Sequence, residues 1–271
     1  MTLEAGPMPS TTRVPLAIAL SGSQDPALLA EAEACVRRWG LPLLLRPPKA
    51  PLRGLLDQAD ALIVFGRDAV SLWDREGHVR GSAGLAALRI DGIDKGRTED
   101  PLQKYGALAP GERVLDATLG FGQDARVAAR LVGPTGAVVG LESSLPLAVL
   151  AQASLARERP SRSAAIEVWH GEACEFLATA QSGEFDVVLF DPMFARTLAS
   201  QPGFDLLRRY ANPAPLTPQM IADARRVARR LVLVKSARYT PALKALGLRP
   251  ERASRSALVV WARVPGSSIL S

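Results

Sequence analysis

The residues Asp191-Pro192-Met193-Phe194 directly follow an apolar run that ends at Phe190. They place a carboxylate, a rigid turn and an aromatic ring within four positions. Asp191, or a carbonyl held rigid by Pro192, can accept a hydrogen bond from an exocyclic amino group, and Phe194 can stack on a flat base. Because Asp-Pro is also common in ordinary turns, the motif indicates base chemistry only where the fold supports it.

Apolar and helical segments alternate along residues 81–271, and this alternation can position the motif. Strands are expected at 114–117, 137–141, 165–169, 185–190, 231–235 and 256–264, with helices at 100–105, 124–131, 146–157, 173–180 and 217–230. Such alternation predicts an α/β fold with a parallel sheet between helices. Asp191 then ends the fourth strand. Lys235 ends the fifth, where it could orient a base or contact a phosphate.

Residues 1–80 read as a separate, smaller α/β unit. Asp25 and Pro26 begin a helix that Gly40 ends, among strands expected at 14–20, 41–45, 61–65 and 70–73. No catalytic pattern stands out in this part. We therefore expect a small N-terminal α/β domain over residues 1–80 and a cofactor-binding domain over residues 81–271.

A glycine-rich turn joins the first strand of residues 81–271 to its helix. Gly120 and Gly122 allow the backbone to approach a ligand closely, and the helix start offers free N–H groups. Gly120-x-Gly122-x-x-Ala125 also matches the dinucleotide fingerprint, with Glu142 where a ribose-binding acid is expected. An NAD(P)-dependent oxidoreductase is therefore one interpretation, and a turn without a ligand is another.

Three acids follow three successive expected strands: Asp116, Glu142 and Glu172. In an open α/β sheet, this carboxyl edge forms the binding crevice. A carboxylate at Asp116 would repel the pyrophosphate of a dinucleotide. Carboxylates suit the sulfonium and ammonium groups of S-adenosylmethionine (SAM), so the three acids favour SAM as the cofactor.

Charge is unevenly distributed along the chain, whose formal net charge is +6. Residues 1–80 carry 9 basic and 9 acidic side chains, residues 81–194 carry 10 and 15, and residues 195–271 carry 14 and 3. The basic block indicates a polyanionic partner, although an arginine-rich composition alone would also produce it. The candidates for phosphate contacts are Arg208, Arg209, Arg225, Arg226, Arg229 and Arg230.

Cys35, Cys174, His78 and His170 are the chain's four cysteines and histidines. They are too few and too scattered for a disulfide framework, a zinc site or a Ser/His/Asp site, so no metal is expected. No apolar run approaches the ~20 residues that cross a bilayer, and residues 14–20 read as a strand rather than a signal peptide. We expect a cytoplasmic protein without membrane association.

At these residues the chain resembles the small-subunit ribosomal RNA guanine-N2 methyltransferase J family, within the class I SAM-dependent methyltransferases. The matching segments are 115–125, 191–194 and 231–243, with a weaker likeness at 38–41. The resemblance implies a Rossmann-like, seven-stranded class I sheet, SAM as the cofactor and rRNA as the substrate. Gln123 and Ser143 stand where the family tends to have arginine. Glu172-Ala173 replaces a pair of small hydroxyl residues.

The combined expectation is a SAM-dependent methyltransferase that acts on an exocyclic base nitrogen, guanine N2 of small-subunit rRNA. The expected catalytic residues are Asp191, Pro192, Phe194 and Lys235. The expected SAM-binding residues are Asp116, Gly120, Gly122, Gln123, Asp124, Glu142, Ser143, Glu172, Ala173 and Asp191. The alternatives are an NAD(P)-dependent oxidoreductase and a catalytically silent RNA-binding protein on a methyltransferase scaffold. The expected partner is rRNA or the ribosomal subunit.

Overall fold

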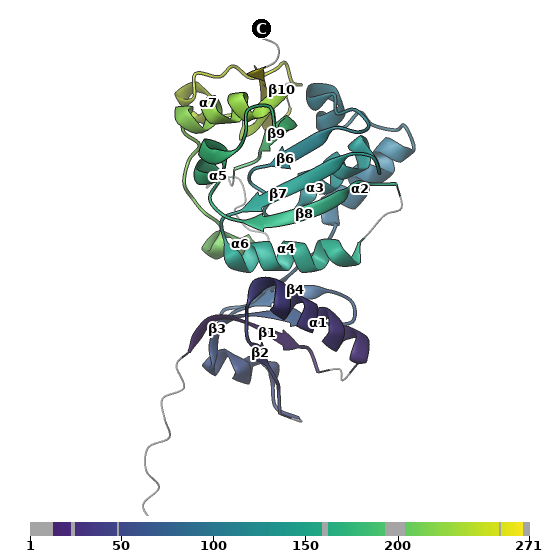
Figure 1. The fold of residues 1–271 in the computed structure, drawn as a ribbon, viewed down its shortest axis with the longest axis vertical. Helices are drawn as coiled ribbons and strands as arrows, with labels where there is room; N and C mark the ends of the chain where they lie inside the picture. Colours follow the sequence, from purple (N-terminus) through teal and green to yellow (C-terminus); the bar gives the residue numbers. More distant parts are fainter. Residues whose placement is uncertain are drawn as a thin grey trace, which may run out of the picture. The chain divides into compact units, whose positions relative to one another are not determined.

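The computed structural model describes residues 13–22, 25–47, 49–158, 162–192, 204–254 and 256–267. The chain divides into two compact units, Met1–Arg80 and Gly81–Ser271 (Figure 1). Among the residues described, no helix is long and apolar enough to span a membrane.

The first unit is built on a sheet of order β2-β1-β3-β4-β5. Its elements are β1 (Val14–Leu20), α1 (Pro26–Trp39), β2 (Leu43–Leu44), the short helix η1 (Leu52–Asp57), β3 (Ala59–Phe65), β4 (Val70–Trp73) and β5 (His78–Arg80). The Asp25 side chain caps α1 by accepting a hydrogen bond from the Ala27 N–H, and Gly40 ends the helix with a φ of 64°. Small and aliphatic side chains such as Ala17, Leu55 and Leu62 form the core of this unit.

The second unit is built on a sheet of order β11-β10-β9-β6-β7-β8. Its strands are β6 (Arg113–Asp116), β7 (Ala137–Glu142), β8 (Ala165–His170), β9 (Phe185–Phe190), β10 (Ala228–Ala237) and β11 (Val259–Pro265). Its helices are α2 (Gly84–Asp94), η2 (Leu102–Gly106), α3 (Gln123–Val132), α4 (Leu145–Arg157), α5 (Ala173–Thr179), α6 (Phe204–Tyr210), α7 (Pro218–Val227) and α8 (Ala242–Ala245). β11 is antiparallel to β10, and the other pairs are parallel.

The expected α/β, Rossmann-like fold is confirmed, but this sheet has six strands in the described residues, where seven were expected. The segment before β11 is linked to that strand by one backbone hydrogen bond, from Glu251 N–H to Trp261 O at 2.7 Å.

The strand order reverses between β6 and β9. From β6 the chain proceeds through β7 to β8, and β9 then pairs with the other side of β6. Right-handed crossovers place the helices of the two halves on opposite faces; α2 packs on α3, and α5 packs on α7 (Figure 1). A crevice is expected at the carboxyl ends of β6 and β9, where the order reverses.

Two helix predictions differ from the structure. α2 occupies residues for which no helix was expected, because Ala83 supplies no capping side chain, Gly92 is a poor helix former and no polar face distinguishes the segment. α7 ends at Val227, and β10 begins at Ala228, which pairs with Phe185 of β9. Arg229 and Arg230 are therefore strand residues rather than the end of a helix.

Candidate active site

A cavity of about 130 Å³ opens at the carboxyl edge of the second sheet. Its walls come from the segments that follow β6, β7, β8 and β9, and its apolar part includes Leu141, Leu147 and Met220. The residues predicted from sequence that line it are Gly120, Glu142, Ser143, Glu172, Ala173, Asp191 and Pro192. The fold thus brings these residues together from four separate segments.

The glycine turn after β6 is held against the end of β7. Gly120 and Gly122 have φ angles of 53° and 70°, in the left-handed region that glycine adopts without strain. The Gly120 N–H donates to Glu142 Oε2 at 2.8 Å, and the Gly122 N–H donates to Leu119 O at 2.7 Å. The backbone of this turn is therefore ordered by the Glu142 carboxylate.

Glu142 is buried, and burial raises its pKa, although two backbone N–H groups oppose this rise. The second of them is the Ser144 N–H, which donates to Oε1 at 2.9 Å. Each carboxylate oxygen has a second lone pair. Glu142 can therefore accept further hydrogen bonds from a pair of hydroxyls in the cavity.

Glu172 is held by a residue that the sequence did not single out. The Asn212 amide lies 3.2 and 3.0 Å from its two carboxylate oxygens, and both residues line the cavity. His170 Nε2 lies 3.0 Å from Ser143 O, which ties the end of β8 to the turn after β7. These contacts fix the wall of the cavity furthest from β9.

Asp191 and Lys235 form an ion pair across the ends of β9 and β10. Lys235 Nζ lies 2.6 Å from Asp191 Oδ2, and the Asp191 N–H donates to Thr118 Oγ1 at 2.6 Å. Burial raises the pKa of Asp191 to about 6, while the Lys235 charge acts in the opposite direction. Asp191 is thus mainly ionised at neutral pH, and it lines the cavity as a hydrogen-bond acceptor.

Lys235 also faces Asp124 and Trp261. Its Nζ lies 3.1 Å from Asp124 Oδ2 and 5.5 Å from the centre of the Trp261 ring. Burial disfavours the ammonium form, but the two carboxylates raise the pKa of Lys235 above its ordinary value. The side chain therefore carries its positive charge in this partly buried position.

Asp124 is buried between two cations. Arg89 of α2 pairs with its Oδ1, and Arg89 also binds Asp100 in a bidentate pair at 2.7 and 3.0 Å. Burial opposes ionisation of Asp124, yet Lys235 and Arg89 hold its pKa below the ordinary range. Asp124 is not among the residues that line the cavity.

Other predicted SAM-binding residues lie behind the cavity wall. Asp116 is only 2% exposed, and burial, together with Asp124 and Asp191, raises its pKa to about 8. Gln123 joins α3 to α2: its Nε2 donates to Ser82 O at 2.9 Å, and its Oε1 accepts from the Ala86 N–H at 2.8 Å.

Two further residues of the expected site, one from the glycine turn and one from the motif 191–194, are not among the described residues that line the cavity. Gly122 begins α3 and does not line it. Phe194, like Met193, lies outside the described residues.

Three arginines proposed for phosphate contacts are bound at the amino edge of the sheet instead. Arg229 Nη1 lies 3.0 Å from Asp186 Oδ1 near the start of β9, and Arg230 lies 2.8 Å from Glu112 before β6. Arg226 donates to backbone carbonyls at the end of α5. They therefore lie opposite the Asp191 edge, which contradicts the expected phosphate contacts beside the site.

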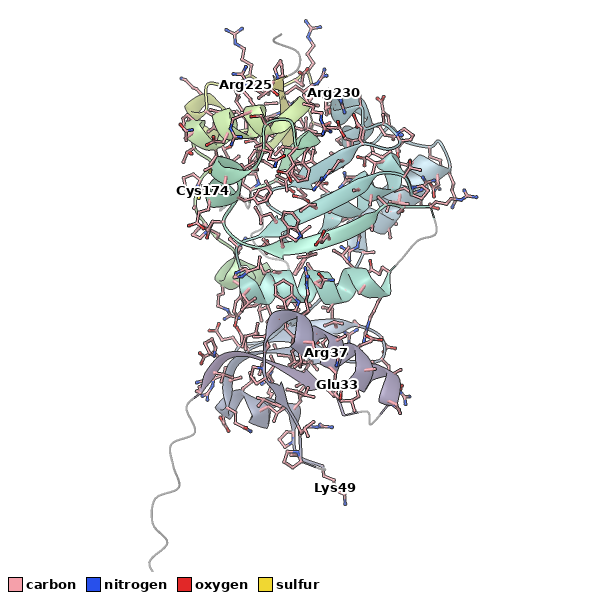
Figure 2. All side chains as sticks on the ribbon, viewed as in Figure 1. Glu33, Arg37, Lys49, Cys174, Arg225 and Arg230 are labelled. Carbon is pink, nitrogen blue, oxygen red and sulfur yellow. The ribbon has the colours of Figure 1, made fainter. Side chains whose placement is uncertain are left out.

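The labelled side chains show the same separation. Figure 2 shows Arg225 and Arg230 together at one end of the unit, apart from Cys174, a cavity residue.

Arg89, Thr118, Asn212 and Trp261 contact predicted site residues but were missed in the sequence. Arg89 could have been identified from the sequence, because it is the single charged residue within the apolar segment 85–90. Thr118 lies in the segment 115–125 that the sequence singled out, but its contact with Asp191 depends on the fold. Nothing local in the sequence marks Asn212 or Trp261.

The chain was compared with known protein families. Residues 92–256 match the family model described as "Putative SAM-dependent methyltransferase". This match spans the glycine turn, the ends of β6 to β10 and the Asp191 motif. It leaves out the first unit and most of α2.

Two individual proteins are similar to this chain in sequence. A Bacillus subtilis protein, uncharacterized protein YpiP, is 31% identical over 207 residues, which are 73% of this chain and 80% of the relative. Ribosomal RNA small subunit methyltransferase J of Nitrosococcus oceani is 31% identical over 147 residues, or 51% of this chain and 56% of that protein. The match thus spans little more than half of the second relative.

The fold also agrees with a solved structure. A SAM-dependent methyltransferase from Neisseria gonorrhoeae superposes with a TM-score of 0.56 at 19% identity, covering 92% of this chain and 95% of that one. At this identity the likeness concerns the fold alone.

Proposed function

Since this chain belongs to the family of SAM-dependent methyltransferases, we propose that it methylates an exocyclic amino nitrogen of an RNA base, guanine N2 of small-subunit rRNA. The observation that carries the proposal is the position of Asp191. Its carboxylate lines the same cavity as Gly120 and Glu142, at the point where the strand order reverses. An acceptor for an amino group therefore adjoins the cavity that suits the methyl donor.

The cofactor is SAM, so the NAD(P)-dependent oxidoreductase alternative is rejected. When bound, SAM supplies a methyl group on a positively charged sulfur. The residues fit such a cation: Glu142, Glu172 and Asp191 line the cavity, and no Lys, Arg or His among the described residues does so. An anionic wall of this kind is unsuited to a pyrophosphate.

The donor side of the site is assigned to two acids. Glu142 would hold the ribose hydroxyls, because it lines the cavity and each of its oxygens has a second acceptor lone pair. Glu172, oriented by Asn212, would accept a hydrogen bond from the adenine amino group. The apolar wall, which includes Leu141 and Leu147, would pack against the adenine ring.

On the acceptor side, Asp191 orients the nucleophile. Its carboxylate would accept a hydrogen bond from one N–H of the amino group, and this contact would turn the nitrogen lone pair towards the methyl carbon. As the N–C bond forms, the bond from the methyl carbon to sulfur would break and leave a neutral thioether, and the positively charged nitrogen would give that proton to Asp191. Lys235 keeps Asp191 ionised for this step, and catalysis consists mainly of positioning and electrostatics.

Three further observations support RNA as the substrate. The relative from Nitrosococcus oceani is named for small-subunit rRNA methylation. Residues 195–271 carry 14 basic side chains against 3 acidic ones; of the basic ones, Arg226, Arg229 and Arg230 lie at the opposite edge and do not count toward this support. In the turn that follows β10, on the same edge as Asp191, Tyr239 is 82% exposed and available to stack on a base.

The test compares rRNA nucleosides by mass spectrometry from wild-type and deletion strains. We expect one N2-methylguanosine to be lost on deletion and restored by the wild-type gene, but not by Asp191→Ala. Calorimetric titration must show that Asp191→Ala still binds SAM. Unchanged nucleosides, together with RNA binding by the protein, would instead support a catalytically silent RNA-binding role.

A further inference from the structure

A chain of alternating charges runs through the second unit to Asp191. It begins with Asp100 before η2, continues through Arg89 of α2 and Asp124 of α3, and reaches Lys235 of β10 and Asp191 after β9. Every neighbouring pair in this chain is a direct ion pair. Five segments that are distant in sequence are thus joined to the carboxylate that faces the substrate.

Within this series of ion pairs, both carboxylate oxygens of Asp124 pair with cations. One carboxylate oxygen pairs with Arg89 and the other with Lys235, and the residue is only 5% exposed. It lies behind the cavity wall rather than in it. These contacts leave Asp124 poorly placed for the SAM-binding role that the sequence suggested.

Lys235 is held from three directions. Two of its N–H groups face the carboxylates of Asp191 and Asp124, at 2.6 and 3.1 Å. The Trp261 ring, which is buried, covers a third side. A flexible lysine side chain is thereby limited to one arrangement, in which its ammonium group stays beside Asp191.

We propose that Arg89 and Asp124 are positioning residues for methyl transfer, which fix Lys235 against Asp191 and do not contact SAM. This inference rests on the proposed function, because it requires Asp191 to act on the amino group. Arg89 acts on Asp124, Asp124 acts on Lys235, and Lys235 sets both the place and the ionisation of Asp191.

The ionisation of Asp191 reports on this arrangement. The titratable and charged groups that face it are Lys235 from β10, Asp124 from α3, Asp116 from β6 and Arg89 from α2. Lys235→Met removes the cation nearest to Asp191. The pKa of Asp191 then rises above about 6, and the acidic limb of the kcat–pH profile moves to higher pH.

The experiment compares Asp124→Asn, Lys235→Met and the double variant with the wild type. We expect Asp124→Asn to leave the Kd for SAM within about threefold of wild type and to lower kcat on rRNA by on the order of 100-fold, as a misplaced group does. If Asp124 acts through Lys235, the double variant is no slower than Lys235→Met alone.

Asp94→Asn is a matched control. It breaks another ion pair between α2 and α3, Asp94 with Arg130 at 2.5 Å, which is not part of the charge chain. We expect near-wild-type kcat from this variant. If thermal unfolding shows that Asp124→Asn is not folded, Arg89→Met takes its place with the same expected effects.

Two outcomes would overturn the inference. In the first, Asp124→Asn loses as much SAM affinity as it loses kcat. In the second, the fold-loss in kcat of the double variant equals the product of the fold-losses of the two single variants. A wild-type protein that transfers no methyl group to rRNA would count against the proposed function instead. In that case the pKa of Asp191, followed by carbon-13 NMR, still tests the arrangement: no rise in Lys235→Met overturns it.

Discussion

At the scale of single residues, Asp116 differs from Asp124 and Asp191 because, in the described residues, no salt bridge joins it to a cation. It is buried at the end of β6, and burial, with Asp124 and Asp191 nearby, raises its pKa to about 8. It therefore carries a proton at neutral pH, whereas Asp191 is mainly ionised. Two neighbouring carboxyl groups thus have different charges because only one of them has Lys235 as a partner.

This difference has a consequence for stability. In the unfolded chain Asp116 ionises near its ordinary pKa of 3.8, so the folded protein binds more protons between pH 4 and 8. Its contribution to the free energy of unfolding therefore falls as the pH rises through this window. At pH 9 the free energy of unfolding of Asp116→Asn should exceed that of wild type by a few kcal/mol. Each unit of difference in pKa between the folded and unfolded states corresponds to about 1.4 kcal/mol.

Urea unfolding of both proteins, without cofactor, at pH 5 and pH 9 measures this effect. The difference between the two proteins isolates Asp116 from the other acids. A stability difference that is the same at both pH values would mean that Asp116 is ionised throughout. Asp186→Asn, which alters an acid at the amino edge of the same sheet, serves as the control.

At the scale of elements, the turn after β10 carries the most exposed aromatic side chain of the described residues. Tyr239 is 82% exposed, and the preceding Arg238 N–H donates to the carbonyl of Leu258, which is itself 70% exposed. The backbone of this turn is therefore tied to β11. An aromatic ring on an ordered turn beside the proposed acceptor site suits an unstacked base.

We expect Tyr239→Ala to weaken binding of a single-stranded rRNA fragment by about 1–3 kcal/mol, because stacking on one base is lost. The Kd for SAM should not change, because Tyr239 is not among the cavity residues. Fluorescence anisotropy and calorimetry measure the two affinities. Leu88→Ala, which removes another exposed apolar side chain from α2, is the control; equal losses from both variants would argue against a specific role for the turn.

At the scale of the whole molecule, the assigned site lies within one of the two units. The cavity, the charge chain and the core around β6 to β11 all belong to Gly81–Ser271. The first unit has its own sheet and its own core. SAM binding should therefore depend on the second unit alone.

A fragment of residues 81–271 should fold and bind SAM with a Kd within about threefold of the full chain. Its hydrophobic core is retained, and domains of this size are stable on their own. Circular dichroism and calorimetric titration check the two statements. Loss of SAM binding by a folded fragment would show that residues 1–80 complete the donor site.

Much of the fold was accessible from sequence because it depends on local pattern. The alternation of strands and helices predicted the parallel sheet, and the ends of successive parallel strands must meet at one edge. Asp191, Glu142 and Glu172 therefore reach one cavity, as expected from their positions after three strands. α2 was missed because it lacks a cap and a polar face, and with it the role of Arg89.

What the sequence by itself determined is the carboxyl edge and the residues that reach it, since the ends of the strands follow from periodicity and parallel strands share that edge. Only the tertiary structure decided which charges pair. Asp124 is 35 residues from Arg89 and 111 from Lys235, and no local pattern specifies contacts over such separations. Arg229 and Arg230 were also expected to contact phosphate beside the site, but residues at the start of a parallel strand lie at the amino edge, opposite the carboxyl edge. Ion pairs depend on the packed positions of side chains from different elements, and those positions exist only once the core has formed.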